Sequence, residues 1–290
     1  MQDEEFWLER FEEHRPRLRA VAYRMLGSQA EADDALQETW LRISRASGRE
    51  VENVGGWLTT ILSRQCLNML RARSTRREEP LEVHVPDPVV EDGPDGDPAE
   101  QNVLADTVGI ALLVVLDSLE PAERLAFVLH DMFGLPFDDI APLVERTPAA
   151  ARQLASRARR RVQGRSLDGR PDPARQRAVV DAWAAASRVG DFEGLVALLH
   201  PDAVLRVDAG AGSSLTKIVR GAAEIAASAA AFRYATAVEA RIALVNGASG
   251  IVASVGGQAV SVLAFTVVDG LVTEIDILSD RSRLEALAIS

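Results

Sequence analysis

The stretch FDDIAPLVERTPAAARQLASRARRRV (137–162) carries the side chains best suited to binding chemistry. Thr147 is a typical helix N-cap and Pro148 a typical first helical residue. After them, apolar residues recur with a period near 3.6, which predicts one buried face. The remaining positions are mostly polar or basic: Arg152, Gln153, Ser156, Arg157, Arg159 and Arg160. Such side chains read base edges in the major groove and bind phosphates, so the pattern predicts the second helix of a helix-turn-helix. The alternative is a solvated basic helix that closes a small bundle.

A second basic stretch lies at the end of WLTTILSRQCLNMLRARSTRR (57–77), a predicted helix with an apolar first half. Arginines at a helix C-terminus complement the helix dipole, which is one interpretation. The other is a nucleic-acid surface on which Trp57, Asn68 and nearby polar groups contact exposed bases. The residues alone leave both open.

Acidic and polar residues lie along one edge of the predicted helix AEADDALQETWLRISRA (30–46), for which Ser28 is a plausible N-cap. This edge consists of Asp33, Asp34, Gln37, Glu38 and Trp40. It is either a solvated face or a docking surface for a partner.

The sequence offers little for catalysis or metal binding. The four histidines lie in different segments, so none has the spacing of a metal site. The single cysteine, Cys66, excludes an intramolecular disulfide and a cysteine-cluster metal site. A glycine-rich phosphate loop and a Gly-x-Ser-x-Gly motif are both missing from the sequence. We therefore expect no catalytic residue, no metal and no cofactor.

The net charge of -11 is concentrated in one short segment. Residues 78–106 contain ten acidic and no basic side chains, whereas the segments on either side are close to neutral. The acidic isoelectric point therefore does not exclude nucleic-acid binding. No apolar run approaches the roughly 18 residues that a membrane span needs. The acidic start of the chain is unlike a signal peptide, so we expect a cytoplasmic protein.

Two segments rich in proline, glycine and charge divide the chain into three blocks. We predict a helical domain (1–77), an acidic linker (78–103), a second helical domain with the helix-turn-helix (104–165), a linker (166–174) and an α+β domain (175–290). The α+β domain starts with helical periodicity and continues with alternating segments. Asn246–Gly247 and Asp269–Gly270 are hairpin signals between these segments, which indicates a curved antiparallel sheet.

Taken together, these segments resemble a bacterial sigma factor of the extracytoplasmic-function group. AEADDALQETWLRI is similar to region 2.2 of that family, and VGGWLTTILSRQCLNMLRARSTRRE to regions 2.3–2.4. LDSLEPAERLAFVLHDMFGLPFDDIAPLVERTPAAARQLASRARR is similar to region 4. The resemblance implies a protein that is not an enzyme. It would bind the clamp helices and flap of core RNA polymerase and direct initiation at promoters with -10 and -35 elements.

The resemblance also implies roles for the residues named above. Docking on polymerase would involve Asp33, Asp34, Gln37, Glu38 and Trp40. The -10 element would be contacted by Trp57, Arg64, Asn68, Arg71 and Arg73, with Arg64 standing where many members have asparagine. The -35 major groove would receive Arg152, Gln153, Ser156, Arg157, Arg159 and Arg160.

The third block resembles a SnoaL-like domain with the cone fold of nuclear-transport-factor-like proteins, which some of these sigma factors carry as a C-terminal extension that modulates activity. HVPDP (84–88) resembles the Trp-Leu-Pro-Glu-Pro linker motif of that subgroup. Two further motifs, Asp-Gly-Gly-Gly-Lys and Asn-Pro-Asp-Lys-Leu, have only DAGAGSS (208–214) and SDRSRL (279–284) as counterparts. One alternative is a cyclase- or isomerase-like enzyme using Asp208 and His200. A domain that senses an unknown small ligand and a conventional repressor are further alternatives.

Overall fold

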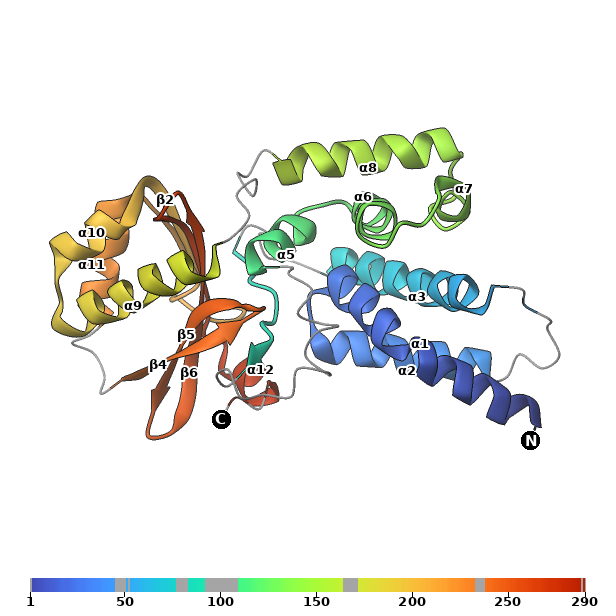
Figure 1. Ribbon diagram of the computed structural model, residues 1–290, viewed down its shortest axis with the longest axis horizontal. Coiled ribbons are helices and arrows are strands. Elements are labelled where there is room, and N and C mark those ends of the chain that lie inside the picture. Colours follow the sequence, from blue (N-terminus) through green and yellow to red (C-terminus); the bar gives the residue numbers. More distant parts are fainter. Residues whose placement is uncertain are drawn as a thin grey trace. The chain divides into compact units, whose positions relative to one another are not determined.

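The computed structural model describes residues 2–44, 51, 53–76, 83–91, 109–163, 172–232, 238–287 and 289. The chain forms two compact units, each with its own core (Figure 1). The first contains the N-terminal helices and the predicted helix-turn-helix. The second contains the C-terminal domain together with residues 83–91 and the start of helix α5.

Three helices open the first unit: α1 (Gln2–Leu26), α2 (Gln29–Ile43) and α3 (Val54–Arg76). Gly27 adopts a positive φ of 74° and ends α1. Ser28 caps α2, its hydroxyl accepting a hydrogen bond from the Glu31 amide, as predicted. The three helices pack against one another around apolar side chains that include Val21, Met25 and Leu62, which are fully buried.

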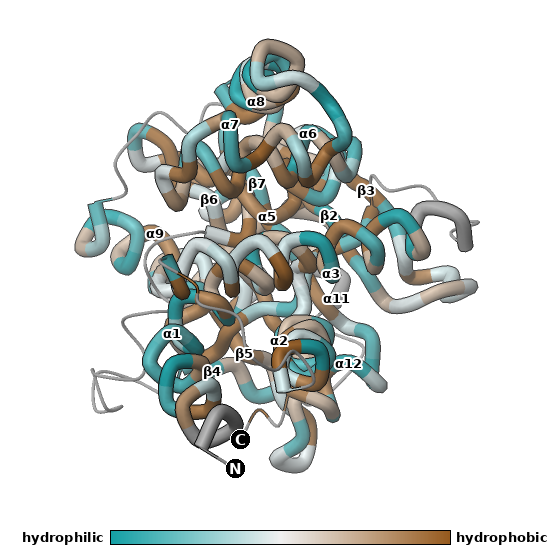
Figure 2. Tube along the Cα trace, turned by 90° about the vertical axis from the view of Figure 1, so that its right-hand side faces the viewer, coloured by the Kyte–Doolittle hydropathy of each residue, from teal (hydrophilic) through white to brown (hydrophobic). Residues whose placement is uncertain are grey.

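The predicted helix-turn-helix is confirmed in the second half of this unit. It follows α5 (Ile110–Asp117), α6 (Pro121–Phe127) and the short π-helix η1 (Val128–Met132). Its two helices are α7 (Phe137–Ile140) and α8 (Pro148–Gln163). The Thr147 hydroxyl accepts a hydrogen bond from the Ala150 amide (3.3 Å), as expected of an N-cap. In Figure 2 the turns of α8 carry both hydrophilic and hydrophobic segments. Ala151, Ala155 and Ala158 are its buried face.

A buried arginine joins the two halves of the first unit. Arg124 of α6 is 1% exposed. Its Nε donates to the Arg24 carbonyl of α1 (3.2 Å), and its Nη1 to Asp117 Oδ1 (2.9 Å). Cys66 of α3 lies fully buried near this guanidinium, and burial raises the pKa of its thiol to about 12. The thiol is therefore protonated and unreactive at neutral pH.

The turn between α7 and α8 contains a non-glycine residue with positive φ, Glu145 (55°). A side chain in this region costs roughly 1 kcal/mol because its Cβ approaches the backbone. We expect Glu145→Gly to raise the free energy of unfolding of the first unit by about 0.5–1 kcal/mol in urea titrations. Glu145→Ala, which keeps the Cβ, is the control. Equal gains in both variants would show that the side chain's charge, not its conformation, is responsible.

The second unit is α+β, as predicted. Its helices are α9 (Pro173–Val189), α10 (Phe192–Leu198), α11 (Ala222–Phe232) and α12 (Arg281–Ala286). Its strands are β1 (Val90–Glu91), β2 (Leu199–Asp208), β3 (Lys217–Arg220), β4 (Glu239–Val245), β5 (Ala248–Val255), β6 (Gln258–Val268) and β7 (Leu271–Leu278). Helices α9, α10 and α11 lie on one side of the sheet (Figure 1). Trp183 of α9 packs edge-on against Phe265 of β6 in the core between them.

The strands form one sheet in the order β1-β4-β5-β6-β7-β2-β3. Asn246–Gly247 and Asp269–Gly270 are two of its hairpin turns, with positive φ at all four residues, as their sequences predict. The expectation of an antiparallel sheet is wrong for one pair, because β2 and β7 are parallel. The chain leaves the end of β2 and returns through β3, α11 and the β4–β6 meander, so β7 enters beside β2 in the same direction. None of the helices in the described part of the chain is long and apolar enough to cross a membrane.

Candidate nucleic-acid and polymerase interfaces

The outer face of α8 carries the predicted -35 residues. Arg152, Gln153, Arg157 and Arg160 are exposed, and Ser156 and Arg159 are partly buried. Opposite the buried alanines, Gln153 and Arg160 point most directly away from the domain, given 100° of rotation per residue. The arginines at the two edges contact the body of the domain, and part of each side chain stays exposed to solvent.

Three of these edge arginines form ion pairs. Arg157 Nε donates to Glu123 Oε1 of α6 (2.7 Å), and Arg161 Nη1 to Glu123 Oε2 (3.0 Å). On the opposite edge, Arg159 Nε donates to Asp131 Oδ1 of η1 (2.9 Å). Sequence reasoning missed Glu123 and Asp131, which lie 34 and 28 residues from their partners in the chain. No local spacing signals such pairs.

The Arg152 guanidinium lies over the ring of Phe137 at 5.3 Å. A cation–π contact at this distance orients the guanidinium without satisfying its hydrogen-bond donors. Arg152 lies in the N-terminal part of α8, the part of a recognition helix that contacts bases.

Four of the five predicted -10 residues share one face of α3. Trp57, Arg64, Asn68 and Arg71 are spaced by seven, four and three residues, which places them in one row. Arg64, Asn68 and Arg71 are exposed. Trp57 is partly buried because it packs against Trp7 of α1, with ring centroids 5.0 Å apart.

Arg73 does not belong to this row. Its side chain is 19% exposed and forms ion pairs with Glu31 of α2 and Asp117 of α5 (3.6 Å to Oδ1). It also donates to the Leu26 carbonyl (3.1 Å). Arg73 follows Arg71 by two residues, which turns it about 200° around the helix toward the buried Arg124–Asp117 pair.

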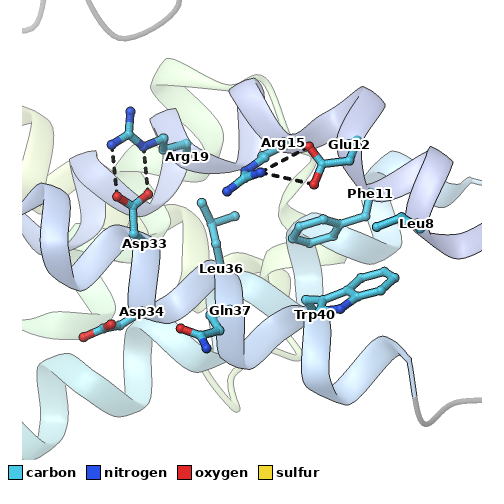
Figure 3. Close-up of a pocket in the computed structure, with 10 residues that line it drawn as sticks. All are labelled: Leu8, Phe11, Glu12, Arg15, Arg19, Asp33, Asp34, Leu36, Gln37 and Trp40. Carbon is cyan, nitrogen blue, oxygen red and sulfur yellow. Dashed lines mark hydrogen bonds and ion pairs between the residues drawn. The ribbon is translucent and has the colours of Figure 1, made fainter.

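A groove of about 580 Å³ runs between α1 and α2 and contains most of the predicted polymerase-binding residues (Figure 3). Asp33, Asp34, Gln37 and Trp40 line it, together with apolar and charged residues of α1. Trp40 packs against Phe11 across the groove, at 5.4 Å between ring centroids. Arg19 Nε donates to Asp33 Oδ1 (2.8 Å). Glu38 lies outside the groove lining and pairs with Arg42 (3.3 Å).

Exposed apolar side chains continue this surface along α1. Phe6 and Leu8 are 46% and 47% exposed. The groove combines aromatic and aliphatic side chains with charged and amide groups. This composition is that of a protein-binding surface, because aromatic anchors and polar rims are typical of such interfaces.

Part of the acidic linker is anchored to the C-terminal domain. His84 Nδ1 lies 3.2 Å from Asp208 Oδ2, and the Val85 amide donates to the same oxygen (3.0 Å). Arg283 donates from Nη1 to Asp208 Oδ2 (2.8 Å), from Nη2 to the Val85 carbonyl (2.5 Å) and from Nε to Asp87 Oδ1 (2.6 Å). The three motif-like segments, 84–88, 208–214 and 279–284, therefore meet at Asp208 and Arg283. Residues 78–82 and 92–103 of the predicted linker lie outside the described residues.

The anchored segment also extends the sheet. The Val89 amide donates to Asn246 Oδ1 (2.9 Å), and the Asn246 amide to the Val89 carbonyl (2.8 Å). Strand β1 then pairs with β4. The sequence predicts only an acidic linker over residues 78–103, but Val85 within it is 2% exposed. Composition did not reveal this docking, since its partners lie more than 120 residues further along the chain.

Asp208 is an anchor for the linker and does not form the catalytic pair considered from the sequence. It lies at the opposite end of β2 from His200, whose ring accepts a hydrogen bond from the Asp202 amide. Burial alone would raise the pKa of Asp208. Hydrogen bonds from His84 and the Val85 amide, with the Arg283 charge, hold this pKa well below its ordinary value. Within the described part of the chain, no three His, Cys, Asp or Glu residues are placed to hold a metal ion.

We expect Asp208→Asn to lower the free energy of unfolding of the second unit by about 2 kcal/mol at pH 7, because a charged acceptor is lost. Asp208 has a lowered pKa in the folded state, so its contribution is complete above its ordinary pKa of 3.8 and is lost as the pH falls below it. The stability gap between wild type and variant should therefore shrink below about pH 4. Asp202→Asn, on the same strand, is the control. A gap that stays constant down to pH 2.5 would contradict the role of the charge.

Comparison with known proteins agrees with this geometry. Residues 10–76 match the Sigma-70 region 2 family, and residues 110–162 match Sigma-70 region 4. The chain is 41% identical to the ECF RNA polymerase sigma factor SigJ of Mycobacterium tuberculosis over 218 residues, which cover 74% of this chain and 69% of that protein. It is 34% identical to the probable ECF RNA polymerase sigma factor SigI of the same organism, with 94% and 93% of the two chains covered.

A solved structure extends the similarity to the whole fold. The crystal structure of M. tuberculosis SigJ superposes with a TM-score of 0.76 at 32% sequence identity. The match covers 98% of this chain and all of that chain. It includes the helical regions and the C-terminal α+β domain.

Proposed function

Since this chain belongs to the ECF RNA polymerase sigma factors, which direct promoter-specific initiation by core RNA polymerase, we propose that its three surfaces divide this task. The α1–α2 groove binds polymerase, the exposed row of α3 contacts the -10 element, and α8 contacts the -35 element. The observation that carries the proposal is the position of the candidate residues. All but Glu38 and Arg73 fall on one of these three surfaces.

The role of α8 is supported by its charge and orientation. Arg152 and Gln153 are exposed near its N-terminus, the part of a recognition helix that reaches base edges. Arg157 keeps two terminal amino groups for phosphate while its Nε holds Glu123. We assign base reading to Arg152 and Gln153, assisted by Ser156. Arg157, Arg159 and Arg160 contact the backbone.

The role of the α3 row is supported by the combination of an aromatic ring, an amide and two arginines on one face. Melted bases stack on aromatic rings, and amides hydrogen-bond their exposed edges. We assign these tasks to Trp57 and Asn68, and phosphate contacts to Arg64 and Arg71. Arg73, which pairs with two carboxylates, orients α3 within the first unit.

The role of the C-terminal domain is supported by its hydrogen bonds and ion pairs with linker residues 84–91. Its core between helices and sheet is packed with apolar side chains such as Val180, Trp183 and Phe265. We propose that this domain modulates initiation by fixing residues 84–91 of the connection between regions 2 and 4. This assignment is favoured over small-molecule catalysis, because Asp208 is engaged by the linker.

Run-off transcription with purified core polymerase tests the proposal. Core polymerase with the full-length chain should retain and transcribe specific duplexes from a genomic library, whereas core polymerase alone should not. Tight duplex binding by the chain alone, with no chain-dependent transcript, would instead identify a repressor.

A further inference from the structure

Two acidic side chains, Glu123 and Asp131, lie beneath the recognition helix α8 and pair with three of its five arginines. We call these two residues the acidic pair. Glu123 belongs to α6 and Asp131 to η1, and the two residues form ion pairs with opposite edges of α8.

The burial of Glu123 makes these ion pairs obligatory. Glu123 is 4% exposed, and each of its carboxylate oxygens accepts from a different arginine. A buried carboxylate without such partners is strongly disfavoured, so Arg157 and Arg161 cannot both leave it for DNA. Their side chains remain 49% and 51% exposed, which leaves part of each guanidinium open to phosphate.

The acidic pair also reduces the net positive charge of the α8 surface that would contact DNA. Its two carboxylates offset two of the five positive charges of α8. Phosphate binding supplies almost all of non-specific affinity and rises with each cation available to the DNA backbone. Gln153 is uncharged and Arg152 stacks on Phe137, so the acidic pair does not weaken the residues to which we assign base reading.

We propose that the acidic pair is a specificity determinant of -35 recognition. The acidic pair fixes the orientation of α8 on the domain and reduces the affinity for DNA that comes from phosphate contacts. Base contacts then contribute a larger share of the total affinity for the -35 element. The inference rests on the proposed function of α8. It assigns Glu123 and Asp131 as positioning residues that do not themselves touch DNA.

The test uses Glu123→Gln and Asp131→Asn, which keep the size of the side chain and one acceptor oxygen, remove the charge and replace the other oxygen with an NH2 donor. Holoenzyme is reconstituted from core polymerase and the full-length chain. It then selects from a pool of promoter duplexes randomised in the -35 window. Wild type should enrich one sequence strongly. Each variant should enrich it several-fold less, retain more non-specific duplex, and show a slope of log affinity against log salt that is steeper by about 1.

Asp138→Asn is the matched control, because Asp138 of α7 is exposed and makes no ion pair among the described residues. If Glu123→Gln fails to fold, as judged by its melting temperature, Asp131→Asn carries the test, since Asp131 is more exposed. Equal enrichment and equal salt slopes in wild type and both variants would overturn the inference and leave the function of α8 intact. So would a change of the same size in Asp138→Asn. Failure of wild type to enrich any sequence would overturn the proposed function, and the inference with it.

Discussion

Holoenzyme assembly should weaken by about 30-fold, or roughly 2 kcal/mol, when Asp34 and Glu38 are both replaced by lysine. Asp34 lines the α1–α2 groove. Glu38 lies outside the groove lining but one turn further along the same edge of α2. Both side chains are directed away from the buried face of that helix, so the melting temperature should change little. Titration of fluorescently labelled chain with core polymerase measures the affinity.

In the control for this experiment, two exposed acidic residues of the other unit, Asp181 and Glu193, are replaced by lysine. The net charge then changes by the same amount as in the α2 variant. If the control weakens assembly as much as the α2 variant, the effect is one of net charge. If assembly of the α2 variant is intact and its melting temperature falls, the acidic edge has a structural role instead.

Arg124→Met should lower the free energy of unfolding of the first unit by about 3 kcal/mol, the largest stability effect we expect. The substitution leaves Asp117, whose side chain is 5% exposed, without its nearest cation. Arg73 lies 3.6 Å from the same carboxylate and compensates only in part. Tryptophan fluorescence during urea unfolding suits the measurement, because Trp7, Trp40 and Trp57 report on this unit and Trp183 alone on the other.

The double variant Asp117→Asn, Arg124→Met separates charge from packing. Removing both partners eliminates the uncompensated buried charge, so the double variant should be more stable than Arg124→Met. A double variant whose loss equals the sum of the two single losses would show that the ion pair contributes nothing beyond packing.

The local features of this fold could be predicted because their causes lie within a few residues. The Thr147 cap, the Gly27–Ser28 junction and the two hairpin turns each depend on one side chain's hydrogen bond or on a positive φ. The buried alanine face of α8 likewise follows from its period. Local rules of this kind located the surfaces of α2, α3 and α8.

The features that escaped prediction depend on contacts between distant segments. The family resemblance groups Arg73 with Arg71 as -10 residues, but the helical rotation between them and the position of Asp117 direct the Arg73 side chain inward. The docking of residues 84–91 depends on Asp208 and Arg283, which a charge count of the linker does not reveal. The parallel β2–β7 pair follows from how the chain returns to the sheet, and strand periodicity carries no information on that.

The central claim is that separate surfaces of one chain read two promoter elements, and run-off transcription from a set of point-substituted promoters tests it most directly. Each base pair of the two elements is changed in turn, and transcripts are compared for wild type, Asn68→Ala and Gln153→Ala. Asn68→Ala should lose discrimination at one or more base pairs of the -10 element and keep it at -35. Gln153→Ala should do the reverse, with about 1–3 kcal/mol of discrimination lost at its base pair. Identical discrimination profiles for the two variants would contradict the claim.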